Sequence, residues 1–282
     1  MIDAHVHMWD PRRFDYPWLS QAPILDRPFI PSDLDGEASG YGAIFVQADC
    51  AGTQSLDEAR WVADLDWSGL RGIVAGADLR SPDLSDHLDA LATVPGVVGV
   101  RHLLQGEDES DWADDDALRA GLRVLAARGL TFDACVHRGQ LTALAPLLES
   151  VPDVKVVIDH LGKPAVDAGI DDAAGRQWLD SMRRLAERPL THVKLSGLAP
   201  EAADRSTLDH NGDAFVTAGL ELFGAERAMI GSDWPVSARL GAGLRPAKWR
   251  DRVLRVAASV GADRDAVDTG TAERFYGLAP TT

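Results

Sequence analysis

The chain has 282 residues, of which 45% are hydrophobic and 26% charged, and its formal net charge is −16. This composition is typical of a globular protein, and the length suits one α/β barrel domain of about 250 residues. The acidic balance argues against nucleic acid or an anionic membrane as the main partner, because both surfaces bind clustered Lys and Arg.

The first apolar run, MIDAHVHMWD, contains two histidines, His5 and His7, separated by one valine. Side chains alternate along an extended strand, so His5 and His7 share one face and Val6 takes the other. Two neighbouring imidazoles can bind a metal or polarise a carbonyl together. The spacing equally suits two partly exposed polar residues near a frayed terminus, since a bare His-x-His is a weak motif.

Eight short β-rich runs follow one another along the chain and alternate with helix-like stretches. The runs cover residues 1–7, 41–49, 70–79, 96–104, 130–137, 154–160, 192–198 and 227–234. The helical stretches cover 55–65, 115–129, 141–152, 176–189, 213–224, 246–261 and 273–278. Apolar strands alternating with helices predict a parallel sheet covered by helices, and eight such units predict a single (β/α)8 TIM barrel domain over residues 1–282. A doubly wound open sheet is the alternative, although the chain has no GxGxxG or Walker A motif.

Two of the helical stretches carry end motifs. Ser55 and Glu58 have the spacing of a capping box, and Gly129 follows the stretch at 115–129 as a helix stop. Two connections, 8–31 and 232–248, are longer than a minimal (β/α)8 barrel requires. Long loops at the catalytic end of a barrel commonly cover the site, so we expect both to act as lids.

Cys50 and Cys135 lie inside or just after apolar runs, which favours buried free thiols in a reducing compartment. No basic N-terminal region precedes an apolar segment, and no apolar run approaches about 18 residues. The sequence therefore predicts neither a signal peptide nor a membrane span, and a cytoplasmic location.

Barrel enzymes build their sites at the C-terminal ends of the strands, and polar residues gather there in this chain. His160 ends one run and Asp233 another, positions that suit a metal ligand or a base. A structural histidine and a loop-capping aspartate are the alternatives. Arg101 could hold a substrate carboxylate or hydroxyls, or pair with Asp78 or Asp49.

The remaining candidates have less definite roles. Alternation with His160 places Asp159 outward or as a brace of the barrel, while Lys194 and Ser196 line the pocket or take part in ion pairing. His137 could reach the mouth or lie on the following loop. Aromatic rings stack on sugars and also anchor loops, so both roles stay open for three residues that flank the expected site: Trp9, Trp18 and Trp234.

Six ordered motifs together resemble the amidohydrolase superfamily, in its amidohydrolase-related branch of sugar lactonases and dicarboxylate lactonases. They are IDAHVHMWDP, GVRHLLQ, VIDHLGKP, KLSGL, GSDWPV and the closing ERFYGL, and they run from the first strand to the last helix. The resemblance implies that His5, His7 and His160 are metal ligands or carbonyl-polarising groups. It also implies that Asp233 activates water and that Arg101 contacts the substrate.

The chain departs from the fuller metal sites of the superfamily. Those sites also use a fourth-strand or bridging carboxylate or lysine and a further histidine, whereas here the fourth strand offers Arg101. His137 is the candidate for the further histidine. The resemblance therefore implies one divalent ion, expected to be Zn²⁺ and held by His5, His7, His160 and Asp233, or none.

The resemblance implies a hydrolase that opens a small lactone by water attack on the ester carbonyl. The expected substrate is a sugar-acid 1,4- or 1,5-lactone such as L-fucono- or L-rhamnonolactone, or a related carboxylated lactone. A metal-dependent decarboxylase of an aromatic or unsaturated acid is the alternative within the superfamily. A binding protein that has lost turnover is a third hypothesis, because one fold hosts many functions. The sequence leaves monomer and homodimer open.

Overall fold

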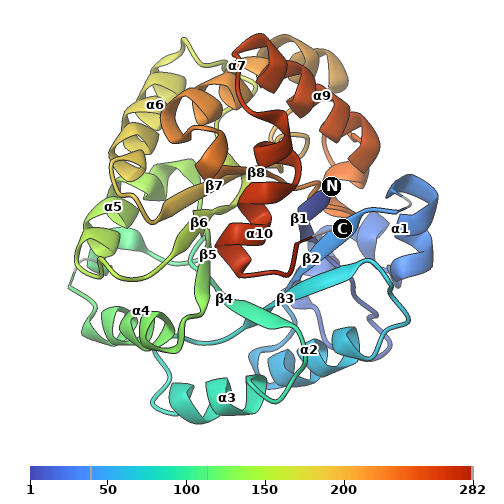
Figure 1. Cartoon of the computed structure of the whole chain (residues 1–282), viewed down its shortest axis with the longest axis vertical. Helices are drawn as coiled ribbons and strands as arrows, with labels where there is room; N and C mark the ends of the chain where they lie inside the picture. Colours follow the sequence, from blue (N-terminus) through green and yellow to red (C-terminus); the bar gives the residue numbers. More distant parts are fainter. Residues whose placement is uncertain (39, 113, 281–282) are drawn as a thin grey trace.

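Eight parallel strands form one sheet in chain order in the computed structural model, which describes residues 1–38, 40–112 and 114–280. Each strand pairs with the next, and the ring of strands surrounds the centre of the molecule in Figure 1. The strands are β1 (Ile2–Val6), β2 (Gly42–Val46), β3 (Leu70–Gly76), β4 (Val97–Leu103), β5 (Thr131–Cys135), β6 (Val156–Ile158), β7 (Thr191–Leu195) and β8 (Ala228–Ile230). The predicted barrel is confirmed, and the open sheet is not found.

Helices cover the outside of this ring (Figure 1). The α-helices are α1 (Pro31–Ala38), α2 (Ser55–Ala63), α3 (Leu84–Leu91), α4 (Asp116–Arg128), α5 (Leu141–Glu149), α6 (Ala173–Ala186), α7 (Arg205–Phe223), α8 (Val236–Arg239), α9 (Pro246–Ser259) and α10 (Thr271–Tyr276). Gly129 ends α4 with a φ of 70°, as predicted. Among the described helices, none is long and apolar enough to cross a membrane.

Each predicted run contains a strand, but most strands stop before the run does. The run at 227–234, for example, contains only the three-residue strand β8. The residues after the strands leave the hydrogen-bonded ladder and form the mouth of the barrel. Apolarity alone cannot mark that point, because the mouth residues are also buried.

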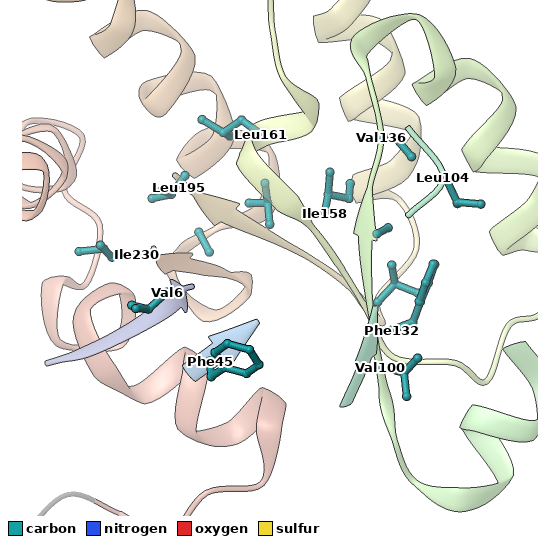
Figure 2. Close-up of a cluster of buried hydrophobic side chains, with 14 of the residues drawn as sticks. Val6, Phe45, Val100, Leu104, Phe132, Val136, Ile158, Leu161, Leu195 and Ile230 are labelled. Carbon is teal, nitrogen blue, oxygen red and sulfur yellow. The ribbon is translucent and has the colours of Figure 1, made fainter. Parts of the chain in front are cut away.

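The apolar core has two parts that lie on opposite sides of the sheet. The larger part fills the layer between strands and helices, and Figure 2 shows some of its members: Val6, Phe45, Val100, Phe132, Ile158, Leu195 and Ile230. The smaller part lies inside the barrel and comprises Ile2, Ala4, Ile44, Val46, Val74, Val157, Met229, Ala272, Phe275 and Tyr276. Since the last three of these belong to α10, this helix closes the end of the barrel at which the strands begin.

The first strand changes register between Asp3 and Val6, where three steps along β1 oppose two along β2. Ile2 and Ala4 therefore belong to the barrel interior, whereas Val6 belongs to the outer layer. A bulge of this kind exchanges the faces of a strand. Asp3 stabilises it, because its Oδ1 accepts the backbone N–H of His5 at 3.2 Å and that of Ser232 at 2.7 Å.

A short bridge joins the two edges of the sheet. Val6 and Trp234 form an isolated parallel bridge, and the backbone N–H of His7 donates to Trp234 O at 2.8 Å. The backbone N–H of Asp233 donates to His5 O at 2.8 Å. The first strand and the segment after β8 are thereby fixed against each other at the mouth.

The predicted capping box at the start of α2 is wrong. Ser55 Oγ donates to Gly52 O, and the Glu58 carboxylate lies away from the helix start. Glu58 instead accepts the Tyr16 hydroxyl at 3.0 Å and the backbone N–H of Ala48. This buried carboxylate therefore ties the loop 8–31 to the end of β2.

The predicted cysteine state agrees with the structure. Cys50 and Cys135 are both free and both buried. Their location in the reducing interior of a cell stays a prediction, because burial by itself protects a thiol from pairing.

We predict that Tyr276→Phe lowers the free energy of unfolding by about 1–3 kcal/mol, because the buried hydroxyl donates to Asp133 Oδ2 at 2.8 Å and its loss leaves that carboxylate short of a donor. Urea unfolding followed by circular dichroism measures the change. Equal unfolding midpoints for the variant and the parent protein would show that this bond does not hold α10 in place.

We predict that Glu58→Gln makes stability less sensitive to pH. Burial raises the pKa of Glu58 to about 7, against hydrogen bonds from Tyr16 and Ala48 that lower it. The unfolded chain ionises first as pH rises, so the folded state loses stability between pH values near 4.5 and 7. The loss amounts to about 3 kcal/mol, at about 1.4 kcal/mol for each tenfold change in acidity.

Urea unfolding at about pH 5 and about pH 8 tests this, and the variant should gain stability relative to the parent at the higher pH. Glu187→Gln is the control, because Glu187 is exposed. A parallel pH dependence of the parent and Glu58→Gln proteins would contradict the prediction.

Candidate active site

A cavity of about 290 Å³ opens at the end of the barrel where the strands finish. Both long loops contribute to its wall. Trp9, Trp18 and Gln21 come from the loop 8–31, and Asp233 and Leu240 come from the loop 232–248. The two loops thus surround the mouth from different sides, which is the position that a lid requires.

His7, His160 and Asp233 form the floor of this cavity, and His5 lies directly beneath them. His5 Nε2 lies 3.1 Å from His7 Nε2, and His7 Nε2 lies 3.5 Å from Asp233 Oδ1. His160 Nε2 approaches the same carboxylate oxygen at 3.7 Å. All four residues are at least 95% buried. The structure therefore brings together the four residues that the sequence singles out.

Left-handed backbone conformations direct two of these side chains toward the cavity. His160 and Asp233 both have a φ of 55°, a conformation that costs a non-glycine residue energy and often marks a functional site. Gly197 lies against His160, and a Cβ there would come within 2.4 Å of the ring. Glycine at this position thus leaves room for the imidazole.

Asp159 does not face outward, which was one of its two expected orientations. Val157 lies inside the barrel, so regular alternation points Asp159 inward too. His160 also reaches the mouth, because its left-handed turn interrupts the alternation. Consecutive residues thus both serve the site, and Asp159 braces the barrel from within.

A fully buried charge network lies beneath the histidines. Lys194 Nζ contacts Asp133 Oδ2 at 2.5 Å, Asp159 Oδ1 at 3.0 Å and His5 Nδ1 at 3.0 Å. Asp159 Oδ1 is also 3.2 Å from His5 Nδ1. Lys194 is therefore an ion-pairing residue of the barrel interior and does not line the cavity.

The network keeps its charges despite burial. Burial lowers the pKa of Lys194, but Asp133 and Asp159 outweigh it and raise that pKa above its usual value. For Asp159, burial raises the pKa, while the Lys194 ammonium and the His5 ring bring it well below the usual value. One ammonium thus compensates two neighbouring carboxylates inside the protein.

The site combines an ionised Asp233 with neutral rings of His5 and His160 at neutral pH. Burial raises the pKa of Asp233, but its interactions with His160, His7 and the Ser237 hydroxyl outweigh it, so the pKa is lowered. Burial lowers the pKa of His160 to about 4, and burial and the Lys194 ammonium lower that of His5 well below its usual value. An ionised Asp233 beside neutral imidazoles can accept a proton.

These residues have the donor set of a divalent metal site. The ring nitrogens of His5 and His7 and a carboxylate oxygen of Asp233 lie within 4.8 Å of one another. His7 Nδ1 donates to Val46 O at 2.8 Å, so a neutral His7 directs the lone pair of Nε2 toward Asp233. Converging lone pairs and a carboxylate suit Zn²⁺, which binds imidazole nitrogen and carboxylate oxygen.

Arg101 lines the cavity, as expected of a substrate-contacting residue. Its expected partners Asp78 and Asp49 are replaced by others, because its Nη2 donates to Gln47 O and its Nη1 lies 3.7 Å from Asp159 Oδ2. Arg101 therefore links the buried network to the cavity.

Three of the predicted site residues do not line the cavity. His5 lies beneath the floor, against His7 and His160. His137 is exposed, and its backbone N–H bonds to Gln140 Oε1. Trp234 is completely buried, with its ring packed edge-on against Phe29 at 5.5 Å between centroids. Trp9 and Trp18, by contrast, both line the cavity and pack edge-on against each other.

The cavity also contains polar residues that sequence reasoning passed over. Lys163, Gln105 and Glu201 form part of its wall, and Lys163 Nζ donates to Gln105 Oε1. Lys163 belongs to the LGKP turn directly after His160, which is a position that a closer reading of the turn could have flagged. Gln105 and Glu201 lie in connections without such a mark.

Comparison with known proteins gives matches over most of the chain. The amidohydrolase family model matches residues 2–278. The L-fucono-1,5-lactonase of Burkholderia ambifaria is 34% identical over 246 residues, covering 85% of this chain and 82% of that protein. The L-fucono-1,5-lactonase of Burkholderia multivorans is 33% identical over 290 residues, covering 98% of this chain and 96% of that protein.

A solved structure gives the same picture of the fold. The crystal structure of an amidohydrolase from Burkholderia multivorans with bound zinc has a TM-score of 0.85 and 32% sequence identity, with 99% of each chain covered. The matched model extends over nearly the whole barrel. This chain is a member of the amidohydrolase family.

Proposed function

We propose that this protein hydrolyses the lactone of a sugar acid. One observation carries the proposal: an ionised, buried Asp233 faces two histidine nitrogens in a cavity of the size of a small ring compound. The relatives that are about one third identical to the chain are L-fucono-1,5-lactonases, which supports a lactone as the substrate.

The chemistry follows from the charge states at the cavity floor. Water adds to the lactone carbonyl carbon while Asp233 takes one of its protons as general base. The negative charge that develops on the carbonyl oxygen is stabilised by hydrogen-bond donors at the cavity floor, among them the ring N–H of His160. The bond between this carbon and the ring oxygen then breaks, and Asp233 returns the proton to that oxygen. The product is a hydroxy acid.

A divalent cation held by His5, His7 and Asp233 would polarise the carbonyl as a Lewis acid. The same residues orient the reactants in its absence. Ser237 Oγ donates to Asp233 Oδ2 at 2.7 Å, which directs the other carboxylate oxygen toward the histidines. Asp233 therefore presents one defined oxygen to the water.

The two sides of the cavity suit a polyhydroxylated ring. Trp18 offers aromatic surface, with the fully buried Trp9 packed edge-on against it, and aromatic rings pack well against sugar C–H faces. Arg101, Lys163 and Glu201 offer donors and acceptors for hydroxyl groups. The choice among fucono-, rhamnono- and carboxylated lactones depends on this wall.

We predict that Asp233→Asn lowers kcat for lactone hydrolysis by at least about 100-fold, because an amide cannot take the proton of the attacking water. Acid release from a panel of sugar-acid and dicarboxylate lactones, followed with a pH indicator, measures this. Ser237→Ala is the milder control, since it removes a bond to Asp233 and leaves the carboxylate in place.

Unchanged turnover by folded Asp233→Asn protein would exclude Asp233 as the base. If the parent protein hydrolyses no lactone of the panel and instead releases CO2 from unsaturated acids, the lactonase proposal is wrong and the decarboxylase alternative replaces it.

A further inference from the structure

His5 Nδ1 lies between a donor and an acceptor. The Lys194 ammonium, which can only donate, is 3.0 Å from this nitrogen, and the Asp159 carboxylate, which accepts when ionised, is 3.2 Å from it. Both partners are fully buried, and they contact each other at 3.0 Å. The surroundings therefore satisfy His5 whether its Nδ1 carries a proton or a lone pair.

The other ring nitrogen of His5, Nε2, faces His7, whose proton position is fixed. Val46 O can only accept, so His7 keeps its proton on Nδ1 and its lone pair on Nε2. His5 Nε2 lies 3.1 Å from His7 Nε2, the atom that carries this lone pair. Two lone pairs at this distance repel each other, so either a proton on His5 Nε2 or a cation must lie between or beside them.

Two arrangements meet this requirement with the same heavy-atom positions. In the first, His5 carries its proton on Nε2 and donates it toward His7, while Nδ1 accepts from Lys194. In the second, the proton lies on Nδ1 and is donated to Asp159, while Nε2 offers a lone pair to a metal ion. The ring stays neutral in both, because it is completely buried beside an ammonium group.

We propose that the Lys194–Asp159 pair makes His5 a tautomer switch, which donates an N–H to His7 without metal and offers a lone pair when Zn²⁺ is bound. His160 is equally adaptable, because its Nδ1 contacts the Ser196 hydroxyl at 2.9 Å and a hydroxyl can donate or accept. His7 alone is fixed. The inference concerns the cluster itself and holds for any substrate.

The switch accounts for how one set of residues can serve with and without a metal. Without the ion, the N–H of His5 is donated to the lone pair of His7 Nε2 and holds the two rings in place. With the ion, the same nitrogen becomes a ligand, and the carboxylate of Asp159 accepts a hydrogen bond from the N–H on the far side of the ring. Metal ligands of this kind depend on such outer partners for their orientation and basicity.

Nitrogen-15 NMR of the histidine side chains reads the tautomer directly. The full-length protein is labelled at histidine, freed of metal with a chelator and then titrated with Zn²⁺, and His5→Gln identifies the His5 resonances. We expect protonated Nε2 in the metal-free protein and protonated Nδ1 at one equivalent of Zn²⁺, with His7 protonated on Nδ1 throughout. Nδ1 protonation of His5 in the metal-free protein would overturn the proposal.

Zinc affinity provides a second readout that is independent of turnover. Asp159 and Asp133 both contact Lys194, but only Asp159 contacts His5. Asp159→Asn should weaken Zn²⁺ binding by about 10–100-fold in competition with a chromophoric chelator. Asp133→Asn is the matched control and should weaken it much less.

An equal loss of zinc affinity in both variants would mean that the charge of the network, and not the proton position on His5, governs binding, and the proposal would then be wrong. If either variant fails to fold, the NMR measurement on the unaltered protein decides alone. Neither readout involves a lactone, so failure of this inference and failure of the proposed hydrolysis are distinguishable.

Discussion

The change of register in β1 determines which face of the first strand enters the barrel. With regular alternation from Ile2 and Ala4, Val6 would face inward and both histidines would face the helices. The extra residue reverses this, and Asp3 accepts the backbone N–H of His5 that the bulge displaces. The same carboxylate oxygen binds Ser232 next to Asp233, so one buried aspartate aligns the histidine pair with the base.

His5 and His160 stay neutral chiefly because they are buried, and the Lys194 ammonium adds to this effect at His5. Lys194 lies at the centre of the interior and pairs with Asp133 and Asp159, while its proximity disfavours a second proton on His5. Removing one partner of such a group leaves an uncompensated buried charge, which costs several kcal/mol. Folding and site chemistry therefore depend on the same ion pairs. Tyr276 connects these pairs to α10 through Asp133, so the helix that closes one end of the barrel supports the site at the other.

The long loops complete the cavity from outside. Glu58 holds Tyr16 and the end of β2 together, and Trp18 Nε1 donates to Ala48 O at 2.8 Å in the same region. The loop 8–31 is thus bound to the barrel at several points, which suits a wall that must keep its aromatic side chains in place. Orientation of a small substrate requires such preorganisation, because ordering mobile residues upon binding costs free energy.

The sequence by itself determined the barrel, its eight strands, and the convergence of His5, His7, His160 and Asp233, because apolar periodicity and strand ends are local properties of the chain. It could not place Asp159, whose neighbour His160 leaves the strand through a left-handed turn, nor exclude Trp234 and His137 from the cavity wall. Only the tertiary structure showed that Lys194 contacts both Asp133 and His5. It also showed that Glu58 accepts a hydrogen bond from Tyr16 and does not cap a helix. Those contacts link residues far apart in the chain, and no local pattern encodes which buried charges will meet.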